Sequence, residues 1–154
     1  MLRIAVIVWL VFAVFTAQAA QITVPSVSAQ PGRTVTADVQ YAAQGALVTA
    51  IQLDLEYDPA LTVSVTIGSP AAGAGKSLTT SDLSAGKKRI LIAGLNQNAL
   101  PDGVLLSLSI SVSSSAGNSA QYPLHISNAA GTDKDGKSVS LDAAAPSGGK
   151  SDYL

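Results

Sequence analysis

Few side chains in this sequence could do chemistry, and the first to consider are the carboxylates of Asp54 and Glu56. Two residues apart on one strand, they would share a face with Cα atoms about 7 Å apart, a spacing that the paired acids of a glycosidase could use. A glycosidase would also need aromatic side chains around a deep cleft, and the chain's one tryptophan is Trp9, near the N-terminus. The pair is more typical of a solvated sheet face than of a catalytic site.

The sequence also contains few of the residues that nucleophilic catalysis requires. A Ser-His-Asp relay needs a histidine that is held by a carboxylate and placed beside a serine. The chain has one histidine, His125, and no cysteine. His125 stands between Leu124 and Ile126 in an alternating pattern, which predicts a solvated histidine on a strand. We expect no enzymatic activity.

Two short motifs resemble ligand sites but lack essential parts. Residues 133–136, Asp-Lys-Asp-Gly, followed by Asp142, are similar to part of a calcium loop, but Gly131 takes the place of the first ligand and no helices flank the segment. A tight hairpin is the favoured interpretation. Residues 73–77 end like a phosphate loop without its spacing or its helix. No cofactor and no metal are expected.

The N-terminus has the pattern of a cleaved export signal. Arg3 precedes the uncharged apolar run Ile4–Phe15, and Ala17-Gln18-Ala19 provides a cleavage site. The run is shorter than the ~20 apolar residues that a membrane-spanning helix needs. We predict a signal peptide at residues 1–19, export to the periplasm or out of the cell, and no membrane span after cleavage.

Composition limits both the partners and the core. The 9 basic and 10 acidic residues nearly balance, so there is no electrostatic case for binding nucleic acid. Without cysteine, the exported chain must be stabilised by core burial alone, which a single domain of this length can achieve. Because only 5% of the residues are aromatic, the core must consist of Val, Ile, Leu and Ala.

The segment Ala46–Leu61 shows the cleanest two-residue alternation and ends at an Asp58-Pro59 turn signal. The alternation predicts a half-buried strand with one apolar face and one mostly polar face. The apolar face would carry Leu47, Thr49, Ile51, Leu53, Leu55 and Tyr57, and the other face Val48, Ala50, Gln52, Asp54 and Glu56.

Further alternating segments are separated by turn residues, and none has helical periodicity over a helical length. Loops are expected at Gly68–Lys76 and Gly94–Asp102. The pattern predicts an all-β chain, a single antiparallel β-sandwich of about nine strands over residues 20–142, followed by a flexible tail at 143–154. The other expected strands are Gln21–Val27, Arg33–Tyr41, Leu61–Ile67, Ser77–Asp82, Lys87–Ala93, Gly103–Ser113, Ala120–Ser127 and Ser138–Leu141.

Four segments in order resemble the cohesin domains of bacterial polysaccharide-degrading scaffolds: Ser28–Arg33, Gln52–Leu61 with its Tyr-Asp-Pro, Pro101–Val112, and the hairpin Gly131–Leu141. The resemblance implies a nine-stranded, jelly-roll-like sandwich that docks a partner protein, typically a dockerin, on one sheet face. It places the family's polar contact positions at about Ala50 and Gln52.

The candidate docking face combines strand and loop residues. An ordinary wet sheet face remains the alternative. Two further functions stay open: a carbohydrate-binding module, although Tyr41, Tyr57 and Tyr122 fall on apolar faces where they could not stack on a sugar, and a structural cell-envelope protein. The expected partner is therefore a dockerin-like or envelope protein, with a polysaccharide as the other possibility. The candidate residues are Gln52, Asp54, Glu56, Asn96, Gln97 and Asn98.

Overall fold

The protein is described by a computed structural model over residues 19–116 and 121–144. Residues 1–18 of the predicted signal peptide and residues 145–154 of the predicted tail lie outside this range. The first strand begins at Ala20, directly after the predicted cleavage site.

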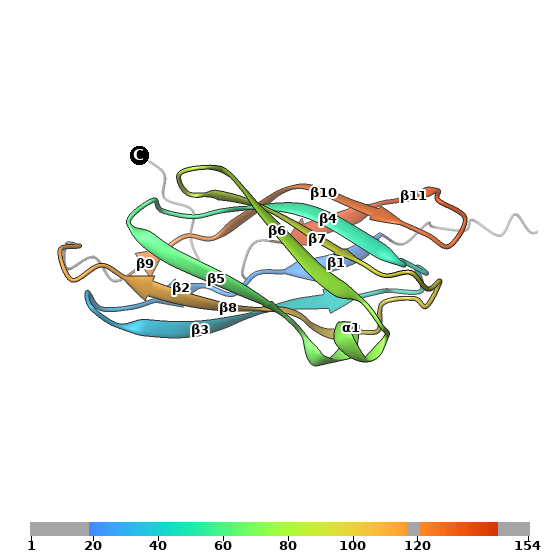
Figure 1. Cartoon of the computed structure of the whole chain (residues 1–154), viewed down its shortest axis with the longest axis horizontal. Coiled ribbons are helices and arrows are strands. Elements are labelled where there is room, and N and C mark those ends of the chain that lie inside the picture. The colour runs from blue at the N-terminus through green and yellow to red at the C-terminus, as the bar shows by residue number, and fades with distance from the viewer. Residues whose placement is uncertain (1–18, 117–120, 145–154) are drawn as a thin grey trace, which may run out of the picture.

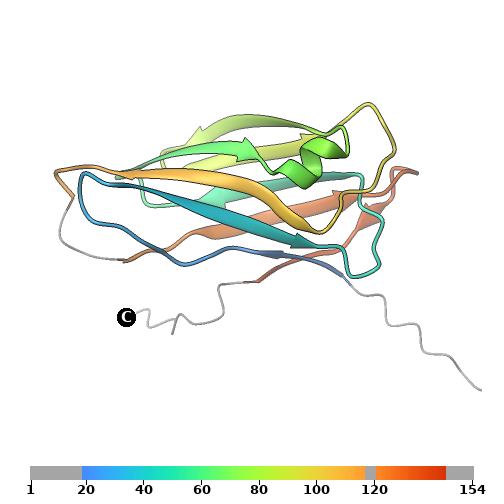
Figure 2. The ribbon, with the colours of Figure 1, turned by 90° about the horizontal axis from the view of Figure 1, so that it is seen from below.

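The described residues form two five-stranded sheets packed face to face, a β-sandwich (Figures 1 and 2). All ladders are antiparallel except the pairing of the first and last strands, which is parallel. The all-β sandwich predicted from alternation is therefore confirmed. One sheet has the order β12(Leu141–Ala144), β1(Ala20–Thr23), β3(Thr34–Ala42), β8(Gly103–Val112), β5(Leu61–Ile67); the other has β11(Ser138–Val139), β10(His125–Thr132), β4(Ala50–Glu56), β7(Lys87–Ala93), β6(Ser77–Ser84).

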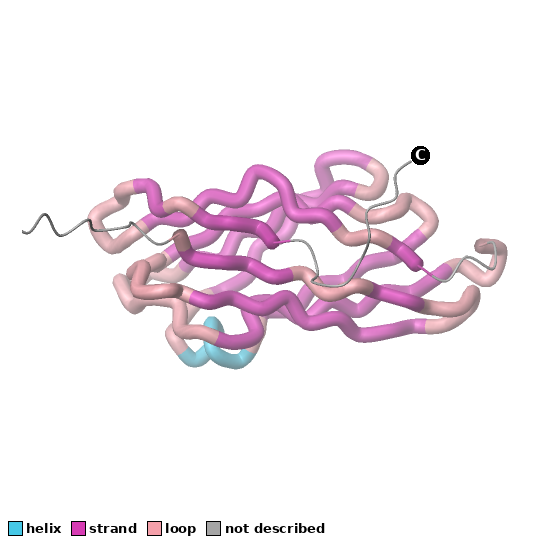
Figure 3. Tube along the Cα trace, turned by 180° about the vertical axis from the view of Figure 1, so that it is seen from behind, coloured by secondary structure: helices cyan, strands magenta, loops and turns pink. Residues whose placement is uncertain are grey.

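Two smaller features complete the architecture. A two-residue ladder joins β2 (Val27–Ser28) to β9 (Gln121–Tyr122). A short helix, α1 (Ser69–Gly73), lies at the margin of the strand layers and connects β5 to β6 (Figure 3).

The core is the layer of aliphatic side chains between the sheets. On β4 and β8, every second residue faces the core and is buried, as the period of a strand requires, and Asp54 and Leu105 are buried in addition. The aliphatic core expected from the composition is thus present, with Tyr41 and Tyr122 also buried. The largest fully buried side chains are Ile22, Val39, Val48, Ile51, Leu53, Leu55, Ile90, Ile92, Leu100, Leu106, Leu108 and Ile110.

The predicted facing of residues 47–49 is wrong. Val48 is fully buried and Leu47 is 66% exposed, the reverse of the expectation. The reason is that β4 begins only at Ala50, and the backbone before it makes contacts outside the regular ladder: the Leu100 N–H donates to the Val48 carbonyl at 2.7 Å. The strand alternation therefore does not extend back to these residues.

Two predicted boundaries also change. The segment 68–76, predicted as a loop, contains α1, whose first turn includes Pro70, a residue that suits this position because it has no N–H to donate. The predicted tail starts at Ala143, but β12 continues through Ala143 and Ala144, which pair with Ile22 and Thr23 of β1. The backbone partner supplied by β1 explains why these residues are ordered in a strand.

We predict that Leu53→Asp will abolish cooperative folding. Leu53 is fully buried in the centre of β4, and an unpaired buried charge costs several kcal/mol, comparable to the stability of a whole domain. Urea denaturation followed by circular dichroism checks this, with Gln52→Asp as the control because Gln52 is the exposed neighbour on the same strand. A cooperative transition in the Leu53→Asp variant would refute the inward facing of this residue.

Candidate partner-binding face

The outer surface of the sheet that contains β4 carries the candidate residues from the central strand. Because Ile51, Leu53 and Leu55 point into the core, Gln52, Asp54 and Glu56 must point outward. The strand register extends them into three rows across β10, β4, β7 and β6, which we call the docking face. The rows are His125–Glu56–Lys87–Ser84, Ser127–Asp54–Arg89–Ser81 and Ala130–Gln52–Leu91–Thr79.

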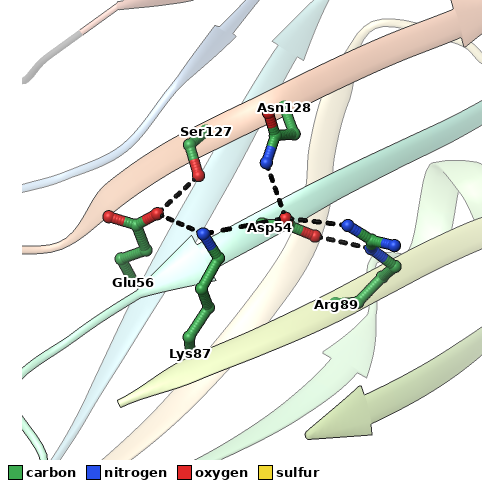
Figure 4. A network of polar contacts seen from close by, with 6 residues as sticks. All are labelled: Asp54, Glu56, Lys87, Arg89, Ser127 and Asn128. Atoms are coloured by element: carbon green, nitrogen blue, oxygen red, sulfur yellow. Dashed lines mark hydrogen bonds and ion pairs between the residues drawn. The ribbon is translucent and has the colours of Figure 1, made fainter. Parts of the chain in front are cut away.

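Asp54 lies at the centre of this face and is 0% exposed. Arg89, directly opposite on β7, donates from Nε to Oδ1 at 2.7 Å and from Nη2 to Oδ2 at 3.0 Å (Figure 4). The Lys87 ammonium lies 3.9 Å from Oδ2. A bidentate arginine pair is the geometry in which a covered carboxylate is best compensated.

Asn128 covers Asp54 from the other side. Its side-chain amide donates to Asp54 Oδ2 at 2.8 Å. Asn128 belongs to a β-bulge between Ser127 and Ala130 and has a φ of 50°, a left-handed conformation that asparagine tolerates better than most residues. The bulge interrupts the alternation of β10 and lets this side chain reach the carboxylate of the neighbouring strand.

Glu56 and Lys87 extend the network toward the end of β4. Lys87 Nζ donates to Glu56 Oε1 at 2.8 Å, and the Ser127 hydroxyl donates to the same oxygen at 2.6 Å. Figure 4 shows the six side chains as one connected group drawn from β4, β7 and β10. The two acids and two bases balance, so the network has no net charge.

These contacts favour the ionised carboxylates. The hydrogen bonds from Arg89 and then from Asn128 lower the pKa of Asp54 to about 2, against the opposing effect of burial. The hydrogen bonds from Lys87 and Ser127 also lower the pKa of Glu56. Both acids are therefore charged at neutral pH.

Two of the three strand candidates have the exposure expected from the sequence. Gln52 is exposed and Glu56 is partly exposed, but the prediction that Asp54 is solvated is wrong because three neighbouring side chains cover it. Sequence reasoning missed Lys87, Arg89 and Asn128. The strand Lys87–Ala93 was predicted, but nothing in the pattern paired it with β4 or brought its side chains to Asp54.

The loop candidates lie at the opposite end of β4 from Glu56. They follow Ala93, whereas Glu56 pairs with Lys87 at the start of β7. Asn96 accepts from the buried Lys76, whose Nζ donates to the Asn96 side-chain oxygen at 2.8 Å and to its carbonyl at 3.2 Å. Burial lowers the pKa of Lys76. Asn96 thus has a structural role that its position in a loop did not indicate.

The other two loop candidates are also engaged within the chain. Asn98 donates from its side chain to the Ala74 carbonyl at 3.1 Å, and its backbone N–H donates to the Asn96 side chain at 3.1 Å. Gln97 Nε2 lies 3.5 Å from the carbonyl oxygen of Lys134. The structure joins Asn96 and Asn98 to each other and to the Ala74 carbonyl, and it places Gln97 beside Lys134, but it joins none of the three to the network around Asp54.

The turn at 133–136 has the hairpin geometry that was the favoured interpretation. The Asp133 carboxylate accepts from the N–H groups of Asp135 and Lys137, at 2.8 and 2.9 Å, and Gly136 has a φ of 76°. Within residues 19–116 and 121–144 there is no group of three or more His, Cys, Asp or Glu side chains placed to hold a metal ion.

Aromatic side chains are not available on the docking face of the described chain. Tyr41 and Tyr122 are buried, and Tyr57 is partly buried against the core. In the same described residues, no helix has the length and apolar character needed to cross a bilayer.

The described residues form a two-sheet β-sandwich with a polar network on the outer face of one sheet. A family model described as the cohesin domain matches residues 20–150, and the chain belongs to this family. A comparison with curated proteins found no match.

Solved structures agree with this fold. CaCohA2 of Clostridium acetobutylicum, in its complex with CaDoc0917, has 23% identity and a TM-score of 0.70 over 81% of this chain and 94% of its own. A non-cellulosomal cohesin of the archaeon Archaeoglobus fulgidus has 24% identity and a TM-score of 0.66 over 82% and 86%. A type I cohesin–dockerin complex of Clostridium thermocellum, Coh-OlpA-Doc918, has 17% identity and a TM-score of 0.69 over 82% and 95%.

We predict that Asp54→Asn will lower the free energy of unfolding at pH 7 by about 2 kcal/mol, the usual value of a charge-assisted hydrogen bond. The pKa of Asp54 is depressed in the folded state, so its stabilisation is present above about pH 4 and is lost as the pH falls toward 2. Urea denaturation of both proteins at pH 7, 4 and 2.5 should show the difference shrinking. A difference that stays constant with pH would contradict this account, and Gln52→Asn is the exposed control.

We also predict that Asn96→Ala will destabilise the fold by about 1–3 kcal/mol, because it leaves the buried Lys76 ammonium without its side-chain acceptor. Gln97→Ala, in the same loop, should change stability by less than about 0.5 kcal/mol. Thermal and urea denaturation of the two variants measures both effects. Equal stabilities would show that Asn96 does not hold Lys76 in place.

Proposed function

We propose that this protein is an exported, non-catalytic docking module and that its docking face binds a dockerin-like partner protein. Three findings support the proposal: membership of the cohesin domain family, a fold similar to that of a cohesin solved in complex with a dockerin, and an N-terminal sequence typical of an export signal. A link to polysaccharide breakdown is part of this proposal.

The observation that carries the choice of surface is the network at the centre of the docking face. A sheet face that serves only as wet surface has no need of a covered carboxylate, whereas here Asp54 holds Arg89 and Lys87 close to one another. Held side chains lose less conformational entropy when a partner binds. The docking face is therefore better prepared for a partner than a surface of independent solvated residues would be.

A carbohydrate-binding module is supported less well. Sugar binding by stacking needs exposed aromatic rings. The three tyrosines in the described chain, Tyr41, Tyr57 and Tyr122, are buried or partly buried. A structural role in the cell envelope would also be a protein-binding role, and the same experiment addresses it.

The test is a binding assay of the purified protein against the dockerin modules encoded in its own genome, in parallel with insoluble polysaccharides. We expect at least one dockerin to bind. Gln52→Arg or Thr79→Arg should then weaken binding about tenfold or more, because each places a large charge on the docking face. Calorimetry or surface plasmon resonance measures the affinities.

Matched controls come from the outer face of the other sheet, where Thr36 and Ser109 are paired neighbours on β3 and β8. Thr36→Arg and Ser109→Arg should leave the affinity within about twofold. Equal losses from both faces would argue against the docking face as the binding surface. Retention on a polysaccharide with no dockerin bound would replace the proposal by the carbohydrate-binding function.

A further inference from the structure

Arg89 is held by Asp54 through only one edge of its guanidinium group. Nε and Nη2 donate to the two carboxylate oxygens. An arginine has five N–H donors, so two on Nη1 and one on Nη2 remain. No hydrogen-bond partner for Nη1 occurs among residues 19–116 and 121–144, and the Arg89 side chain is 40% exposed. The free edge has the forked geometry that matches a carboxylate bidentately.

Leu91 is the neighbouring outward-facing residue of β7. It follows Arg89 by two residues on β7, so both side chains point outward, with Cα atoms about 7 Å apart. Leu91 is 40% exposed and has Gln52 and Thr79 as its cross-strand neighbours. An exposed leucine between two polar side chains offers apolar area to a partner.

Glu56 supplies the opposite charge on the other side of Arg89. Only Oε1 of Glu56 takes part in hydrogen bonds within the described chain, so Oε2 remains as an acceptor. Glu56 is diagonal to Arg89 across β4 and β7, a separation of about 7–8 Å. The docking face therefore carries three groups at neighbouring positions: the free Oε2 acceptor of Glu56, the free N–H donors of Arg89 and the apolar side chain of Leu91.

We propose that Arg89 and Leu91 select the partner, which presents a carboxylate to the free edge of Arg89 beside an apolar side chain that covers Leu91. This inference rests on the proposed docking function. A carboxylate is the preferred complement because three N–H donors of Arg89 remain after its pairing with Asp54, and a partner that desolvates them must supply acceptors, which a carboxylate does bidentately. A basic partner group fits above Glu56 rather than Arg89.

Asp54 acts here as a positioning residue. It lies beneath the outer groups with no exposed surface of its own, and it fixes the direction of the Arg89 fork by accepting from two of its nitrogens. Its effect on binding must therefore pass through Arg89. In an Arg89→Gln background, Asp54→Asn should cause no further loss of affinity, whereas a purely structural role would make the two losses independent.

The experiment measures the affinity of the wild-type protein and its variants for a dockerin that binds in the panel. Arg89→Lys keeps the charge but removes the fork, and we expect it to weaken binding about tenfold; Leu91→Ala should weaken it by about fivefold or more. Thr36→Ala, on the opposite sheet face, is the control. Thermal denaturation confirms that each variant is folded.

The partner's carboxylate is found by replacing the acidic residues of the dockerin with their amides one at a time. When the dockerin carries one of these replacements, Arg89→Lys should cause no further loss of affinity, as a double-mutant cycle requires for groups in contact. If the wild type binds a dockerin and the Arg89 and Leu91 variants bind it within twofold, or no acidic residue couples to Arg89, this inference is overturned while the docking function stands. If no dockerin binds the wild type, both are overturned.

Discussion

The fixed register of β4 is the constraint on which both the fold and the docking face depend. This strand lies in the middle of its sheet, paired with β10 on one side and β7 on the other. A slip by one residue would expose Ile51, Leu53 and Leu55 and bury their polar neighbours, so the core burial determines which residues face outward. Asp54 is thereby placed on the outer face between two paired strands, where neighbouring side chains cover it and its charge has to be compensated.

The charge of Asp54 is compensated by residues from both neighbouring strands, and each strand has a feature that brings its residue to the carboxylate. On β7, the register sets Arg89 directly opposite Asp54; on β10, a bulge with a left-handed residue brings the amide of Asn128 to the same carboxylate. Removing one of these hydrogen-bond partners would leave the covered charge of Asp54 incompletely satisfied. The free energy lost in that case is larger than the free energy that the intact ion pair gains over an apolar pair in the same place. The network therefore fixes the directions of the side chains on the docking face. Fixed side chains favour specific recognition of a partner more directly than they favour stability.

Much of the fold could be predicted from the sequence because the alternation of period two is local. The strands β3, β7 and β8 are present within one residue of where alternation predicted them, and β4 occupies the central part of its predicted segment. The coverage of Asp54 could not be predicted, since Arg89 and Asn128 are 35 and 74 residues away along the chain and meet it only through strand pairing. Polarity gave the correct side of the strand but not the contacts made there.

The contacts of the loop residues could not be predicted from the sequence either, and these contacts reduce the part of the docking face that a partner can use. Asn96 and Asn98 were expected to be available because polar loop residues usually are, yet their amides hold the buried Lys76 and the carbonyl of Ala74. A side chain committed to its own chain has little left to offer a partner. At this end of the sheet Leu95 is a fully exposed apolar side chain, while the charged network runs from Asp54 in the middle of the docking face to Glu56 at the other end of β4. Since an interface needs donors and acceptors that are free yet fixed in direction, specificity should concentrate where Glu56, Arg89 and Leu91 lie.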